Sequence, residues 1–252
     1  MWAIGGVRQC VCFTMSVWKL RWTSERSIWV TLPDTVIHPL VSSQLAAWVS
    51  SAHRDDVRAA VPSSCGVLIE FDTRQRMTND PWSTVIEMLE SFEREQASTG
   101  SPNILDAREI RIPVCYDELL APDMTEVAQL LNCHPEMIIE KHTSIAYNVD
   151  TMGFMPGFGY LSGLEDSLRL RRKEIPRTRV PAGSVAIAEN MTAVYPHQSA
   201  GGWHLIGRTP LQLFNPDLKD PAMLRMGDSV RFERITLKEF NHYNDTQRRG
   251  DC

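Results

Sequence analysis

The chain has 252 residues, 43% of them hydrophobic, which is enough for one large or two modest domains with real cores. Its formal net charge of -5 argues against the positive field of a nucleic-acid-binding protein, and no apolar run approaches the roughly 20 residues that span a bilayer. Six cysteines without a CxxC pair suit a reducing cytoplasm, so we expect a cytoplasmic protein with neither nucleic acid nor membrane as a partner.

The first part of the chain predicts a small α+β domain over residues 23–96. Residues 1–22 fit no element well and are interpreted as a poorly patterned extension, with Met1 and Met15 both open as the true start. SIWVTL, from Ser27, is rich in β-forming residues, and a helical pattern follows from His38. Two short apolar runs then surround a turn, and a capped helix begins at Pro81. This order is of the split βαβ type.

The polar, turn-prone segment 96–103 predicts a boundary before a second domain over residues 104–236. REIRIPVCYD alternates like a strand, and Asp123 with Glu126 three residues later forms a capping-box pattern ahead of a helix. From Gly153 onward, many short strands alternate with turns, which predicts an all-β barrel or sandwich. The tail 237–252 is polar and is expected to fray.

The stretch GFMPGFGYLSGL, residues 153–164, combines four glycines with three aromatic rings. Its backbone is too rich in glycine for a helix and too broken for a long strand. The rings either fill the end of a barrel or line a groove, and sequence statistics favour the core. The groove interpretation selects Phe158 and Tyr160, together with Trp203 from a later glycine-rich loop.

Two further stretches carry cations that could hold an anion. RLRRKEIPRTRVPAGSVAI contains six Lys or Arg residues ahead of a strand, among them Arg177 and Arg179. Such a cluster either binds a phosphate or carboxylate or is a solvated basic loop. In SAGGWHLIGRTP, Gly201 and Gly202 allow close backbone approach to a ligand or a bulge, and Arg208 is a second candidate anion ligand.

His142 is the candidate general base, because it ends a short predicted helix just before a strand. The alternative is that a charged His142 favours the helix carboxyl terminus electrostatically. No set of His, Cys, Asp and Glu residues has zinc-ligand spacing, so we expect no metal. Neither GxxxxGK[ST] nor GxSxG occurs, so the chain has no phosphate loop of its own.

The motifs GFMPGFGYLSGL, PRTRVPAGSVAIA and GGWHLIGRTP closely resemble the carboxyl-terminal domain of the allophanate hydrolase subunit 1 family. This family is also known as the B subunit of 5-oxoprolinase and includes the sporulation-kinase inhibitor. The resemblance is strong over residues 110–235, whereas residues 27–95 fit only in the order of elements. The family usually has SPGGW where this chain has Ser199-Ala200-Gly201-Gly202-Trp203, so a rigid proline is missing.

The resemblance implies a ferredoxin-like α+β domain followed by a mainly-β, cyclophilin-like barrel. It also implies a bacterial cytoplasmic origin and partnership with the A and C subunits of 5-oxoprolinase, of which the C subunit is similar to biotin-dependent carboxyltransferases. The implied reaction is ATP-dependent opening of 5-oxoproline to L-glutamate, with the isolated chain inactive. Two alternatives remain open. One is a non-catalytic inhibitor that binds a sensor histidine kinase, and the other is a component of urea or allophanate metabolism.

We assign roles from the chemistry that this reaction needs. Cations must hold phosphate and carboxylate, donors must face developing negative charge, and a base must activate water. The predicted catalytic residues are His142, as the base, and Arg208. Arg177 and Arg179 are predicted to hold anions, with Gly201 and Gly202 as backbone donors.

Overall fold

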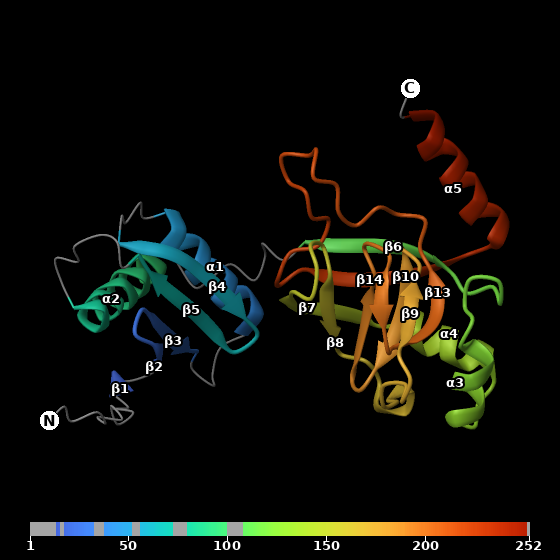
Figure 1. Ribbon diagram of the computed structural model, residues 1–252, viewed down its shortest axis with the longest axis horizontal. Coiled ribbons are helices and arrows are strands. Elements are labelled where there is room, and N and C mark those ends of the chain that lie inside the picture. Colours follow the sequence, from blue (N-terminus) through green and yellow to red (C-terminus); the bar gives the residue numbers. More distant parts are fainter. Residues whose placement is uncertain are drawn as a thin grey trace, which may run out of the picture. The chain divides into compact units, whose positions relative to one another are not determined.

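The computed structural model describes residues 14–15, 18–32, 38–51, 56–72, 80–99 and 108–250. The chain forms two compact units, Met1–Asp106 and Ala107–Cys252 (Figure 1). Helix α2 (Pro81–Thr99) runs into the polar segment 96–103 that we predicted as the boundary, because polarity alone does not end a helix.

The first unit is an antiparallel sheet with two helices. Its strands neighbour each other in the order β1 (Thr14–Met15), β2 (Trp18–Ser24), β3 (Ser27–Thr31), β5 (Gly66–Phe71) and β4 (Val57–Ser63). Helix α1 (His38–Ser51) follows β3, and α2 follows β5. Alternate residues of β3 and β5, such as Val30 and Ile69, pack against Leu45 of α1 and Val85 of α2. The predicted strand pair and both predicted helices are therefore present.

Two features of this unit differ from the sequence analysis or go beyond it. The predicted extension 1–22 overlaps β2, in which Trp18 and Leu20 are buried while Lys19 and Arg21 are exposed. This alternation is a strand signal that we did not use for the boundary at residue 23. A ferredoxin-like βαββαβ unit ends in a strand, whereas here β2 occupies the place beside β3 and precedes it in the chain. The ferredoxin-like assignment stays a prediction.

The second unit is a closed barrel, as one of the two predicted β architectures requires. The strands close in the order β10 (Ser184–Ala188), β11 (Met191–Val194), β8 (Gly159–Ser162), β7 (Ala146–Met152), β14 (Ser229–Ile235), β6 (Glu109–Cys115) and β13 (His204–Arg208). Strands β6 and β14 are parallel, and the other pairs are antiparallel. A short 3-10 helix, η2 (Asp166–Leu168), follows β8.

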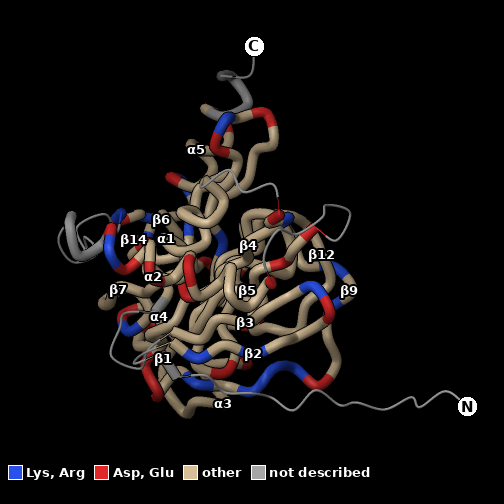
Figure 2. Tube along the Cα trace, turned by 90° about the vertical axis from the view of Figure 1, so that its left-hand side faces the viewer, with Lys and Arg blue, Asp and Glu red and all other residues tan. Residues whose placement is uncertain are grey.

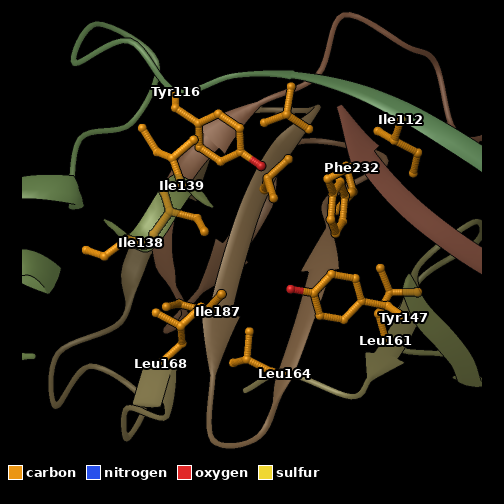
Figure 3. Packing of buried hydrophobic residues seen from close by; sticks show 14 of the residues in the cluster. Ile112, Tyr116, Ile138, Ile139, Tyr147, Leu161, Leu164, Leu168, Ile187 and Phe232 are labelled. Carbon is orange, nitrogen blue, oxygen red and sulfur yellow. The ribbon is translucent and has the colours of Figure 1, made fainter. Parts of the chain in front are cut away.

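The barrel interior is filled by side chains from alternate strand positions and from helices α3 (Met124–Leu130) and α4 (Pro135–Ser144). Figure 3 shows Tyr116, Ile187 and Phe232 packed inside it. The interior is therefore a packed core and leaves the outer face for other uses.

A second hydrophobic cluster covers the outer face of β8, β10, β11 and β13. In β10, Val185 and Ile187 belong to the interior, and Ala186 and Ala188 belong to this outer cluster. A separate two-stranded ribbon contributes Val180 to the same cluster and consists of β9 (Arg177–Val180) and β12 (Ser199–Gly201). Small residues in β10 thus leave room for large rings outside the barrel.

Two predictions at helix ends were wrong. Asp123 stands at the amino-terminal cap of α3, but its side chain makes no capping hydrogen bond and binds other groups. The tail 237–252, predicted to fray, forms helix α5 (Leu237–Gly250), which leads away from the barrel (Figure 1). Thr236 Oγ1 accepts a bond from the Glu239 N–H at 3.3 Å, and Glu239 Oε2 accepts one from the Thr236 N–H at 2.7 Å. This reciprocal capping box starts the helix.

Candidate functional site

The stretch 153–164 forms a tight turn and then strand β8. The Gly153 N–H donates to the Phe158 carbonyl at 3.1 Å, and Phe154 and Gly157 both have positive φ, 66° and 80°. A side chain at Gly157 would strike Phe214, so glycine is required there for both backbone and space. The turn leaves Phe154 exposed and buries Phe158, so the rings divide between surface and core.

The outer aromatic cluster consists of Phe154, Phe158, Tyr160, Tyr195 and Trp203. Phe158 lies at its centre, with ring centroids 4.9 Å from Tyr160, 5.4 Å from Tyr195 and 6.1 Å from Trp203. The contacts are edge-to-face, which suits aromatic quadrupoles. Tyr160 is half-buried with its ring centroid 6.0 Å from that of Trp203, so the predicted groove residues Phe158, Tyr160 and Trp203 do lie together. The exposed Phe154 contacts Phe158, with ring centroids 5.3 Å apart.

Arg172 extends this cluster with a cation. Its Cζ atom lies 5.9 Å from the centroid of the Trp203 ring, within range of a cation–π contact. The sequence analysis noted Arg172 in the basic cluster but gave it no role, because nothing in the sequence pairs it with a tryptophan 31 positions later.

Arg177 is paired with a buried carboxylate. Its guanidinium donates to both carboxylate oxygens of Asp123, at 2.7 and 2.5 Å, and Lys173 donates to the same carboxylate at 3.2 Å. The Leu205 N–H donates to Asp123 at 2.7 Å as well. Burial alone would raise the pKa of Asp123, but the hydrogen bonds from Arg177 and Leu205 outweigh it and lower that pKa below its usual value.

Arg179, two residues further along β9, remains exposed. Its Nε donates to the side-chain carbonyl of Gln198 at 2.7 Å, and no ion pair involves it among the residues that the structure describes. Figure 2 shows Lys and Arg positions along β9. Gly201 lies opposite Arg177 in the ribbon and packs against the hydroxyl of Tyr195, while the Gly202 carbonyl accepts the Lys173 N–H at 2.7 Å. Packing thus already accounts for glycine at position 201.

Arg208 is aimed by a bulge in β13. Val185 pairs with Gly207 and Ala186 pairs with Leu205, so Ile206 is an extra residue in β13. Without this bulge Arg208 would share the inward side of Ile206; with it, Arg208 lies opposite Ser184 on the outer side. The side chain is half-buried, and burial lowers its pKa.

One contact anchors the Arg208 guanidinium. Its Nε donates to the carbonyl of Ala182 at 2.8 Å, and within the described ranges no carboxylate forms an ion pair with it. The two Nη groups therefore remain available as donors, in the planar arrangement that suits a carboxylate or phosphate.

His142 lies on the opposite side of the barrel wall, with none of its surface exposed. Its ring stacks on Phe232 with centroids 4.5 Å apart. Thr192 donates to the Ala186 carbonyl at 3.0 Å and so accepts from His142 Nε2 at 2.9 Å. Nδ1 consequently accepts from the Tyr116 hydroxyl at 2.8 Å, which fixes a neutral tautomer.

Burial accounts for this neutral state and lowers the pKa of His142 to about 3. A neutral ring does not interact with the helix carboxyl terminus as a cation would, so that alternative was wrong. A role as general base needs a path for water to a ring whose two nitrogens are already bonded to Tyr116 and Thr192. The structure does not bring His142 together with the cations of the outer face.

Two kinds of feature were not found in the described part of the chain. No three His, Cys, Asp or Glu side chains gather into a metal-binding group among the described residues. In the same part of the chain, no helix has the length and apolar character to cross a bilayer.

Comparison with known proteins gives the family. The model of the carboxyltransferase domain, subdomain C and D, matches residues 18–224. The 5-oxoprolinase B subunit of Bacillus subtilis (strain 168) is 45% identical over 141 residues, which cover 56% of this chain and 59% of that protein. The 5-oxoprolinase B subunit of Escherichia coli O157:H7 is 41% identical over 155 residues, which cover 61% of this chain and 70% of that protein.

The fold is also similar to that of a solved structure, TTHA0988, with a TM-score of 0.69 and 31% identity. The match covers 83% of this chain but 39% of that one. The aligned part spans about six-tenths of the Bacillus subtilis relative as well, at 59% of its length. By the match over residues 18–224, this chain belongs to the family of the carboxyltransferase domain, subdomains C and D.

Proposed function

We propose that this chain is the B-type subunit of an ATP-dependent 5-oxoprolinase, which opens 5-oxoproline to L-glutamate together with partner subunits. The relatives at 41% and 45% identity, both named as the B subunit of 5-oxoprolinase, support the reaction class. The observation that carries the proposal on this chain is Arg208, a half-buried guanidinium anchored through Nε with no carboxylate partner in the described part.

The reaction creates a need for such a group. The lactam of 5-oxoproline is a resonance-stabilised amide that water attacks very slowly, and ATP supplies the activation. The substrate and the product glutamate both carry a carboxylate, and negative charge also develops at the carbonyl oxygen. Arg208 fits either anion, because its Nη donors are partly withdrawn from water, where a charge-assisted bond is stronger.

The other residues divide between binding and packing. Arg179 is a second cation, whose exposed position in the ribbon suits an anion or a protein partner. Arg177 serves Asp123, so its proposed effect on a ligand is indirect. Partners of the A and C types would supply what this chain lacks in sequence, namely a phosphate loop for the nucleotide.

The test is reconstitution. The chain is co-expressed with A-type and C-type subunits of 5-oxoprolinase, and glutamate formation from 5-oxoproline is measured with and without ATP. We expect ATP-dependent turnover by the complex and none by the isolated chain. Turnover by the isolated chain at the rate of the complex would refute the subunit model. A stable complex without activity would instead favour a binding role, such as inhibition of a histidine kinase.

A further inference from the structure

Asp123 joins four parts of the second unit. It opens helix α3, its backbone N–H donates to the Leu205 carbonyl at 3.1 Å, and its carboxylate accepts the Leu205 N–H at 2.7 Å. The same carboxylate, in a residue that is 1% exposed, binds Arg177 of β9 through two bonds and Lys173 through one. We call these four residues, Asp123, Lys173, Arg177 and Leu205, the Asp123 clamp.

The clamp holds the segment that covers the outer aromatic cluster. The Lys173 ammonium is held by Asp123 at 3.2 Å and also by the Glu126 carboxylate, and its backbone N–H donates to the carbonyl of Gly202, one residue from Trp203. Arg177 starts β9 and lies opposite Gly201 of β12. Arg172, adjacent to Lys173, is the residue whose guanidinium lies over Trp203.

We infer that Asp123 is a positioning residue of the candidate site, acting through Arg177 and Lys173 to hold segment 171–177 and the β9–β12 ribbon against the outer aromatic cluster. The positioning of the ribbon by Asp123 can be tested on the isolated chain. Its effect on enzyme kinetics rests on the proposed function. Breaking the Asp123–Arg177 pair releases the start of β9, while Lys173 keeps its bond to Glu126, so the contact between Arg172 and Trp203 is loosened from the Arg177 side.

The same unit contains a matched control. Asp228 is 4% exposed and accepts two bonds from one guanidinium, that of Arg108, at 3.0 and 2.5 Å. It also accepts one bond from a backbone N–H, that of Arg225, at 2.7 Å. Asp228 stands just before β14 and contributes nothing to the ribbon or to the outer aromatic cluster. Asp228→Asn thus removes the same kind of charge pair elsewhere in the barrel.

The experiment reads the environment of Trp203 directly. Of the seven tryptophans, six lie in residues 1–106, so Trp203 is the one that belongs to the barrel unit. The full chain is labelled with 5-fluorotryptophan, and the Trp203 resonance is assigned in the ¹⁹F NMR spectrum with Trp203→Phe. We expect Asp123→Asn to shift or broaden this resonance and leave the other resonances in place. Asp228→Asn should leave the Trp203 resonance unchanged.

Equal effects of the two variants on Trp203, or no effect of Asp123→Asn, would overturn the inference. If Asp123→Asn does not fold, Arg177→Ala and Arg177→Lys decide. Arg177→Ala should move the resonance, and Arg177→Lys, which keeps one charged donor, should restore much of the original spectrum. A Trp203 resonance that moves equally in Arg177→Ala and Arg177→Lys would also contradict the inference.

The kinetic arm uses the reconstituted complex. The ribbon carries Arg179, the second candidate cation for an anion, so displacing it should raise KM for 5-oxoproline by roughly tenfold or more. We expect this for Asp123→Asn but not for Asp228→Asn. Loss of kcat at unchanged KM, in both variants alike, would indicate general damage. If no complex is active, the proposed function fails. The NMR result on the isolated chain still tests the Asp123 clamp independently.

Discussion

Polar side chains inside the barrel differ from those on its outer face in how far their hydrogen-bonding groups are already satisfied. Inside, His142 is fully buried, neutral and bonded at both ring nitrogens to Tyr116 and Thr192. Outside, Arg208 is anchored by one carbonyl and keeps donors free, within the part of the chain that the structure describes. The interior therefore uses polar groups to specify one packing arrangement, and the outer face keeps charge available for a ligand.

The outer face itself contains both kinds of cation. Arg177 is half-buried and pairs with the buried carboxylate of Asp123, whereas Arg179, two residues later, lies on the surface with an amide partner. Removing Arg177 should therefore lower the free energy of unfolding more than removing Arg179. The predictions below test these contrasts in order of expected effect.

The largest expected effect is acid sensitivity of the interior. Well above pH 6.5, His142 is neutral in both the folded and the unfolded state, so it does not make the free energy of unfolding depend on pH. Below that value the unfolded chain binds a proton that the folded chain excludes until about pH 3, so the free energy of unfolding falls as pH falls. The slope is at most about 1.4 kcal/mol per pH unit. Asp123, with its lowered pKa, adds to the loss only below about pH 4.

Urea unfolding of the chain between pH 7 and pH 3 measures this dependence. The control is His142→Gln, which can bond to the same neighbours but does not titrate. The variant should lose stability in neutral buffer and show a flatter pH profile. Equal slopes for the two proteins would mean that His142 does not control the acid response.

The second prediction concerns His142→Ala. The substitution removes a ring that stacks on Phe232 and leaves Tyr116 and Thr192 without their partner. A cavity and unsatisfied hydroxyls together should lower the free energy of unfolding by about 4 kcal/mol. Denaturant titration at pH 7.5 gives the value, and a loss under about 1 kcal/mol would contradict the interior role.

The third prediction compares the two arginines of β9. Arg177→Ala leaves the buried Asp123 carboxylate without its bidentate partner and should cost about 3 kcal/mol of folding stability. Arg179→Ala removes an exposed side chain and should change stability by less than about 0.5 kcal/mol. Thermal and urea unfolding of both variants under one set of conditions provides the comparison, and similar losses would mean that the ion pair is not the cause.

The fourth prediction separates binding from stability at Arg208. Arg208→Ala should lower the activity of the reconstituted complex about a hundredfold, which corresponds to roughly 2–3 kcal/mol of transition-state binding. The isolated chain should lose little stability, because its one anchoring bond is to the Ala182 carbonyl and no described carboxylate depends on it. A well-folded variant with full activity would remove Arg208 from the site.

Much of the fold follows from periodic patterns in the sequence. A run of β-forming residues predicted β3, and strand alternation predicted β6. An Asn/Asp cap with Pro81 marked the start of α2, where the Asp80 carboxylate accepts the Ser83 N–H at 3.3 Å. The glycine-rich and aromatic motifs predicted that Phe158, Tyr160 and Trp203 line one groove. The three rings do lie in one cluster, in which Phe158 and Trp203 are buried, and the groove stays a prediction. Local patterns succeed here because the forces that they report act between near neighbours in the chain.

The partners of the charged and titratable groups came only from the tertiary structure. Asp123 looks like a helix cap in sequence because Glu126 follows it, yet its carboxylate binds Arg177, 54 positions away. His142 looks like a base and is sealed inside the barrel, and a single extra residue at Ile206 turns Arg208 outward. Burial and pairing depend on which strands meet when the barrel closes, and a shift of one residue exchanges inside for outside. The sequence by itself therefore determined the order of helices and strands. Which charged or titratable side chains are buried, paired or free was decided by long-range packing.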